Sequence, residues 1–176
     1  MLPLIGVAVI GAAAAVVGLA ARKPNEFRLS RSTRIKAPAD RIFANLVDFH
    51  RWEAWSPWEK LDPALKRTHS GPASGKGAVY EWEGNGKVGK GRMEIVEVVE
   101  PQRVVIAMHF VKPMESRSTV EFSLVPSGEA TEVTWSMTGQ SPFIQKVMGV
   151  LMDMDAMIGK NFEQGLASLK TISETR

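Results

Sequence analysis

The sequence predicts an α+β domain in which a curved antiparallel sheet of about seven strands wraps around one long C-terminal helix. Between residues 78 and 139, apolar side chains recur at every second position in runs separated by turn residues, as in strands with one buried face. After residue 142 the apolar spacing changes to three or four, the period of a helix. A sheet with one apolar face must be covered, and this final segment is the longest element available to cover it.

A strand and a short helix are predicted before the main run of strands. Residues 27–35 alternate between apolar or small side chains and charged ones, as a half-exposed strand does. A short helix follows the turn at residues 37–40, because apolar residues between 42 and 47 share one helical face. The later strands are predicted where alternation is clearest, at residues 78–83, 92–95, 104–110, 119–124 and 133–138.

The final segment is predicted to form a single helix over residues 141–172, with Ser141 as its N-cap. Three glycines, Gly149, Gly159 and Gly165, interrupt its pattern. Each costs about 1 kcal/mol relative to alanine inside a helix. We therefore expect them where the helix bends or where its backbone closely approaches a neighbour.

Composition excludes several classes of function. The chain has 176 residues, which suits one domain with an appendage, and no cysteine, which excludes disulfides, thiolate catalysis and cysteine-ligated zinc. Its 22 Lys and Arg residues nearly balance 19 Asp and Glu residues. Although the pI is 9.3, the excess basic residues form no face or tail, so we expect no nucleic-acid partner.

The N-terminal segment is predicted to be a membrane anchor. Residues 2–21 contain no charge, and twenty helical residues span about 30 Å, the thickness of the hydrocarbon core of a bilayer. A cleaved secretory signal is an alternative, but such signals normally carry a basic residue before the apolar run, and none is present here. A buried helix is a second alternative. The predicted division is an anchor at residues 1–23 and a domain at residues 24–176.

Flanking charge predicts the orientation of this single-pass anchor. No basic side chain precedes the apolar run, whereas five follow it closely. The positive-inside rule therefore places the domain in the cytoplasm. The five basic residues are Arg22, Lys23, Arg28, Arg31 and Arg34.

Three tryptophans lie within seven residues in a stretch that has neither a helical nor a strand period. Trp52, Trp55 and Trp58 are interrupted by Ser56-Pro57. One interpretation is that the indoles fill the core at one end of the sheet. The other is that one or two of them line the mouth of a ligand cavity, where an indole offers a flat apolar wall and one N–H donor.

Candidates for catalytic chemistry are few. His50, His69 and His109 lie on different predicted elements without the spacing of metal ligands, so we expect neither a metal site nor a cofactor. No nucleophile motif such as G-x-S-x-G occurs. Glu97 shares its strand phase with Met93, so it points inward unless a bulge intervenes. The alternative is that Glu97 lies in water at the end of its strand.

Five stretches resemble the SRPBCC superfamily, which has the helix-grip fold that is also called START-like or Bet v 1-like. More closely, they resemble its bacterial polyketide cyclase/dehydrase-like members, some of which carry an N-terminal membrane segment. The similarity covers residues 27–172. The stretches are IKAPADRIF (35–43), WEAWSPW (52–58), YEWEGN (80–85), TEVTW (131–135) and FEQGLASLK (162–170).

The resemblance implies functions without a shared catalytic signature. Members of this superfamily bind lipids, sterols or polyketides, assist chaperones, or catalyse cyclisations. We expect this protein to bind a hydrophobic small molecule, a lipid or a polyketide-like compound, between the sheet and the C-terminal helix. The rival hypotheses are a cyclase or dehydratase, which needs a polar residue in the cavity, and a protein-interaction module, which predicts a filled core and an exposed apolar patch.

We select candidate cavity residues by the direction in which each side chain points, as predicted from the period of its strand or helix. Aromatic residues and methionines dominate it, and methionine adapts to irregular apolar space. No catalytic residue is assigned, and the protein partner, if any, is unknown. The candidate ligand-binding residues are Trp55, Trp58, Tyr80, Trp82, Met93, Met108, Phe110, Phe122, Trp135, Met148 and Met152.

Overall fold

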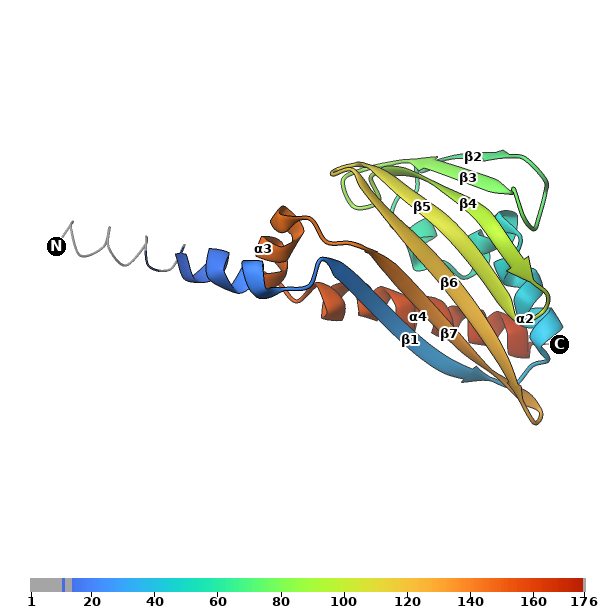
Figure 1. The fold of residues 1–176 in the computed structure, drawn as a ribbon. Coiled ribbons are helices and arrows are strands. Elements are labelled where there is room, and N and C mark those ends of the chain that lie inside the picture. Colours follow the sequence, from blue (N-terminus) through green and yellow to red (C-terminus); the bar gives the residue numbers. More distant parts are fainter. Residues whose placement is uncertain (1–10, 12–13, 176) are drawn as a thin grey trace.

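The computed structural model describes residue 11 and residues 14–175, and within them seven antiparallel strands form one sheet in the order β1-β7-β6-β5-β4-β3-β2. Strands β2 to β7 follow one another as a meander, and β1 pairs with β7 at one edge (Figure 1). The strands are β1 (Glu26–Ile35), β2 (Lys66–Ser70), β3 (Val79–Glu83), β4 (Lys90–Val99), β5 (Arg103–Lys112), β6 (Ser116–Ser127) and β7 (Ala130–Gln140).

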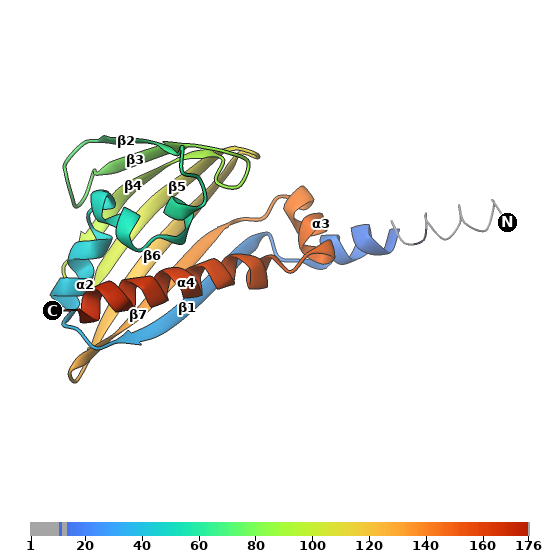
Figure 2. The ribbon, with the colours of Figure 1, turned by 180° about the vertical axis from the view of Figure 1, so that it is seen from behind.

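The C-terminal helix and the short helices that link β1 to β2 lie on the concave side of this curved sheet, as Figure 2 shows. The C-terminal helix packs against β1 and meets the short helices that link β1 to β2. This arrangement confirms the predicted α+β class and the sheet wrapped around a C-terminal helix. The helices are α2 (Ala39–Leu46), the 3₁₀ helices η1 (Phe49–Ala54) and η2 (Pro57–Lys60), α3 (Phe143–Leu151) and α4 (Met154–Glu174).

The predicted single helix over residues 141–172 is wrong, because the chain forms two helices there. Met152 is extended, with φ −136° and ψ 139°, and ends α3. Asp153 then caps α4, its side chain accepting a hydrogen bond from the backbone N–H of Ala156 at 2.9 Å. Ser141 is not an N-cap, since Pro142 occupies that position without a side-chain hydrogen bond.

At two of the three helix glycines, an added Cβ would clash with a neighbouring side chain. A Cβ at Gly165 would lie 2.7 Å from Cζ3 of Trp135 and 3.1 Å from Cδ of Pro57. A Cβ at Gly159 would overlap the guanidinium of Arg31. The close approach expected from the sequence is therefore found at both positions, and it lets α4 lie tightly against the sheet and η2.

The sequence pattern misses β2, and a bulge decides the position of Glu97. The β2 sequence, KRTHS, is polar and lies at the sheet edge, so it lacks the apolar alternation that marks the other strands. In β4 the register shifts between Ile95 and Glu97, which turns Glu97 outward to an ion pair with Arg103. Of the two interpretations of Glu97, the exposed one is correct.

The N-terminal segment is described only in part. Residues 14–22 are helical, whereas most of the apolar run at residues 2–13 lies outside the described residues. In the part of the chain that the structure describes, no helix is both long and apolar enough to cross a membrane. The anchor and its orientation stay predictions.

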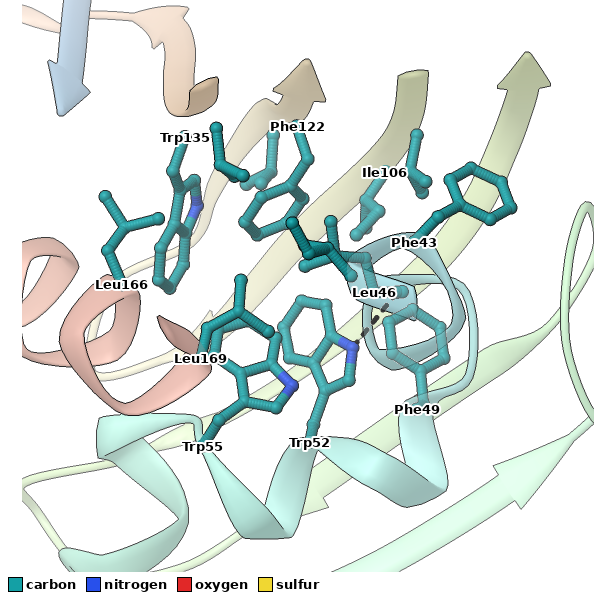
Figure 3. Packing of buried hydrophobic residues seen from close by; sticks show 14 of the residues in the cluster. Phe43, Leu46, Phe49, Trp52, Trp55, Ile106, Phe122, Trp135, Leu166 and Leu169 are labelled. Atoms are coloured by element: carbon teal, nitrogen blue, oxygen red, sulfur yellow. Dashed lines mark hydrogen bonds between the residues drawn. The ribbon is translucent and has the colours of Figure 1, made fainter. Parts of the chain in front are cut away.

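Two of the three clustered tryptophans belong to the core. Trp52 on η1 and Trp55 directly after it are both buried. The indole N–H of Trp52 donates to the backbone carbonyl of Leu46 at 3.1 Å (Figure 3), and that of Trp55 donates to the carbonyl of Asn45 at 3.2 Å. Both rings pack edge-on against Phe122 with centroids 6.0 Å apart. Trp58 on η2 is only half-buried. The core interpretation therefore holds for Trp52 and Trp55, whereas the half-buried Trp58 packs against the edge of the core.

Replacing Trp55 with alanine is expected to destabilise the fold strongly. The change removes a fully packed ring and one buried hydrogen bond, and such core truncations cost about 3–5 kcal/mol. Trp58→Ala is the matched control, and its free energy of unfolding is expected to fall less, because this ring is only half-buried. Urea unfolding of both variants measures the difference, and equal losses would contradict the assignment of Trp55 to the core.

Candidate functional site

A partly open space of about 180 Å³, here called the inner cavity, lies between the concave face of the sheet, η2 and α4. Side chains of β3 to β7 form one wall, and Ile158 and Phe162 of α4 form the other. Nearly all of the lining is apolar or aromatic. A dry apolar cavity of about 150 Å³ is large enough to hold benzene, so this space accommodates a small ring or a short hydrocarbon segment.

Seven of the eleven candidate residues line the inner cavity. Their inward direction follows from strand alternation, except for Trp58, which η2 turns toward the cavity. Whether they bind a ligand stays a prediction. The seven are Trp58, Tyr80, Trp82, Met93, Met108, Phe110 and Trp135.

The other four candidates lie elsewhere. Trp55 and Phe122 are fully buried in the packed core beside the cavity rather than in its lining. Met148 and Met152 were expected in the cavity wall, and this placement is wrong. The helix break after Leu151 puts Met148 on α3, away from the cavity, and leaves Met152 exposed.

A polar cluster that sequence reasoning missed reaches the inner cavity from η2. Glu59 lines the cavity and is only 9% exposed. Its Oε1 accepts a hydrogen bond from the hydroxyl of Tyr80 at 2.5 Å, and its Oε2 accepts one from Nε of Arg67 at 2.6 Å. Glu59 lies in a stretch without regular periodicity, and its partner Arg67 is on the unrecognised strand β2, so no sequence signal marked the pair.

Burial and the neighbouring carboxylate change the titration of Tyr80. Burial of the phenol, followed by its hydrogen bond to Glu59, raises the pKa of Tyr80 well above its usual value of about 10. The same carboxylate raises the pKa of Arg67 by accepting its hydrogen bond. The phenol therefore stays protonated and uses its proton to hold Glu59. Each carboxylate oxygen of Glu59 already accepts one hydrogen bond and has a second lone pair free. Glu59 is therefore better suited to accept a further hydrogen bond than to act as a general base.

The histidines lie outside the inner cavity. The rings of His50 and His69 stack with centroids 4.1 Å apart beside a separate pocket of about 250 Å³. Burial, followed by the charge of His50, lowers the pKa of His69. His109 contacts Glu115 at 3.0 Å. Among the described residues, no three His, Cys, Asp or Glu side chains are grouped as metal ligands.

A larger space of about 570 Å³, here called the outer pocket, lies next to the inner cavity. It is lined by residues 23, 24 and 26–29, the neighbouring ends of β5 to β7, and parts of α3 and α4, including Met148. Phe110, Met137 and Ile158 line both spaces. These three side chains form the partition between them.

A curved antiparallel sheet closed by a C-terminal helix over an apolar cavity defines the helix-grip class of proteins. The profile of the family described as "Polyketide cyclase / dehydrase and lipid transport" matches residues 26–174. The chain belongs to this family, which is part of the SRPBCC superfamily. A search of curated proteins finds no match.

Solved structures share the fold at low sequence identity. Protein CV1439 from Chromobacterium violaceum has a TM-score of 0.61 at 16% identity, covering 88% of this chain and 100% of that one. The Aha1 dimer from Colwellia psychrerythraea has a TM-score of 0.61 at 18% identity, covering 85% and 97%. Major latex-like protein 151 from Panax ginseng has a TM-score of 0.61 at 14% identity, covering 85% and 99%. These similarities show the fold alone.

The raised pKa of Tyr80 predicts a loss of stability at alkaline pH. An unfolded chain releases the phenolic proton above about pH 10, whereas the folded protein retains it. The contribution of the Tyr80 phenol to the free energy of unfolding is therefore fully present below pH 10 and falls by about 1.4 kcal/mol per pH unit above it. Tyr80→Phe is expected to remove this part of the pH dependence of the free energy of unfolding.

The measurement is unusually direct because Tyr80 is the only tyrosine. Phenolate absorbance of the wild type is expected to rise only together with loss of the folded signal in circular dichroism. A phenolate signal near pH 10 in a protein that is still folded would show that Tyr80 is not held as described.

Proposed function

We propose that this protein binds an apolar small molecule non-covalently in the inner cavity. The observation that carries the proposal is the concave, largely apolar space between the sheet, η2 and α4. Ligand sites are typically concave and apolar, with a few polar groups that fix orientation. Ser56, Glu59 and Asn161 supply such groups here, so the ligand is expected to carry one polar end near them.

The size of the two spaces constrains the ligand. About 180 Å³ holds a small ring or a short chain, but not a whole sterol or phospholipid. A longer ligand would extend past Phe110, Met137 and Ile158 into the outer pocket. An elongated molecule with its polar end at Glu59 and its apolar body directed toward the outer pocket fits both spaces. The lipid-transport description of the family supports this ligand class.

Binding is favoured over the two rival hypotheses by specific observations. An enzyme would need a free acid or base in the cavity, but Glu97 lies outside it and Glu59 is held by Tyr80 and Arg67. A protein-interaction module would combine a filled core with an exposed apolar patch, whereas the core here leaves a partly open cavity. We also propose that residues 2–21 attach the domain to a membrane on its cytoplasmic side, because this run is uncharged and basic residues follow it.

Filling the inner cavity tests the proposed function. Met108→Trp places a larger side chain into the cavity from β5, and Val111→Trp adds the same side chain to an exposed position of the same strand. Binding of the fluorescent probe N-phenyl-1-naphthylamine is expected to weaken at least about tenfold in the first variant, a loss of about 1.4 kcal/mol, and to stay unchanged in the second.

Both variants are first checked for native circular dichroism and thermal unfolding. Equal binding by wild type and a folded Met108→Trp variant would show that the probe does not enter the inner cavity. Absence of binding by the wild type would contradict the proposal itself. Native mass spectrometry of the wild type purified from cells would then identify any molecule that does occupy the cavity.

A further inference from the structure

We propose that α3 and the start of α4 dock onto the surface of an anionic phospholipid bilayer. This interaction surface goes beyond ligand binding in the inner cavity. Its main observation is a group of large apolar side chains that are exposed on this short segment, here called the docking face. They are Phe143, Ile144, Leu151, Met152 and Met157.

The docking face is exposed because α3 is attached to the molecule through its polar groups. Lys146 is the only charged residue of α3, and its buried ammonium donates to Oδ1 of Asn25 at 2.5 Å. Lys23 donates to the backbone carbonyl of Gly149. A surface helix of a globular protein normally turns its apolar side inward and its polar side outward. In α3 this arrangement is reversed, which marks an interaction site.

The position of α3 indicates what covers it. Figures 1 and 2 both place α3 beside the helix of residues 14–22, at the end of the molecule opposite the C-terminus. Val17 and Leu19 of that helix are also exposed. The sequence upstream of it continues without a charge to residue 2. Two apolar segments that are distant in sequence thus meet at one end, where a bilayer would contact both.

Charge beside the docking face selects the type of bilayer. Besides the buried Lys146, the outer pocket, which borders α3, is lined by the basic residues Lys23, Arg28 and Arg117 and by two acidic ones, Glu26 and Asp155. An amphipathic helix flanked by basic residues binds membranes that contain anionic lipids. A second copy of this chain would bring the same basic residues to the contact, so charge disfavours self-association through this face.

Docking in this orientation would place the outer pocket at the bilayer surface. Since the outer pocket shares Phe110, Met137 and Ile158 with the inner cavity, an apolar molecule would have a short route from the membrane to its binding site. This last step rests on the proposed function, whereas the docking itself does not.

The absence of cysteine allows a site-specific test with the full chain. Leu151→Cys places a single thiol on the docking face, and Val125→Cys places one on β6 near its hairpin to β7, away from α3 (Figure 1). The two side chains are similarly exposed, at 67% and 59%. Each variant is labelled with the environment-sensitive dye NBD and reconstituted into vesicles of phosphatidylcholine and phosphatidylglycerol, some of whose acyl chains carry a nitroxide quencher.

The dye at position 151 is expected to shift its emission to the blue and to lose intensity to the nitroxide, while the dye at position 125 does neither. Ile144→Cys is a second probe of the docking face if Leu151→Cys does not fold. Quenching that is absent at positions 151 and 144, or equal at position 125, would overturn the proposal. A blue shift that depends on protein concentration but not on nitroxide lipid would overturn it in favour of a second copy.

This outcome is independent of ligand binding. If N-phenyl-1-naphthylamine fails to bind while the dye at position 151 is quenched, the proposed function fails and docking stands. If the probe binds and no quenching occurs, docking fails and the proposed function stands.

Discussion

Trp135 occupies the contact between the sheet and the C-terminal helix. Its ring stacks on Phe162 of α4 with centroids 4.2 Å apart, and it meets Trp55, the residue directly after η1, edge-on at 5.6 Å. Gly165 lets the helix approach this ring, since a Cβ there would come within 2.7 Å of it. Aromatic pairs of this kind contribute about 0.5–1.5 kcal/mol each beyond the area that they bury. Sheet, η1 and α4 therefore depend on one shared set of contacts.

The inner cavity is a consequence of where this packing stops. Trp135 belongs both to the packed aromatic cluster and to the cavity wall, so it separates a filled part of the interior from an open one. Beyond it the lining includes Met93, Met108 and Met137, side chains that adapt to irregular space. Close packing and open space are thus divided between two halves of the same interior.

Strand alternation predicted the architecture and most of the side of the inner cavity that the sheet forms, because the side-chain period of two fixes which residues face inward. The other predictions failed where the local backbone departs from a regular strand or helix. The bulge between Ile95 and Glu97 turned the Glu97 side chain away from the interior, and the cap at Asp153 divided one expected helix into two. Glu59 was not predicted, because its inward direction depends on a 3₁₀ turn and on Arg67, a partner on a polar edge strand. Periodicity reports on regular elements, whereas polar contacts between irregular segments become visible only in three dimensions.

The break between α3 and α4 has a consequence for how this protein can change over time. Helix α4 has its own cap at Asp153, so its helical register does not depend on the sequence of α3. Substitutions on the outside of α3 leave Ile158, Asn161 and Phe162 of the cavity wall in place. Selection can therefore alter the exterior of this end and the wall of the inner cavity as two separate traits within one small domain.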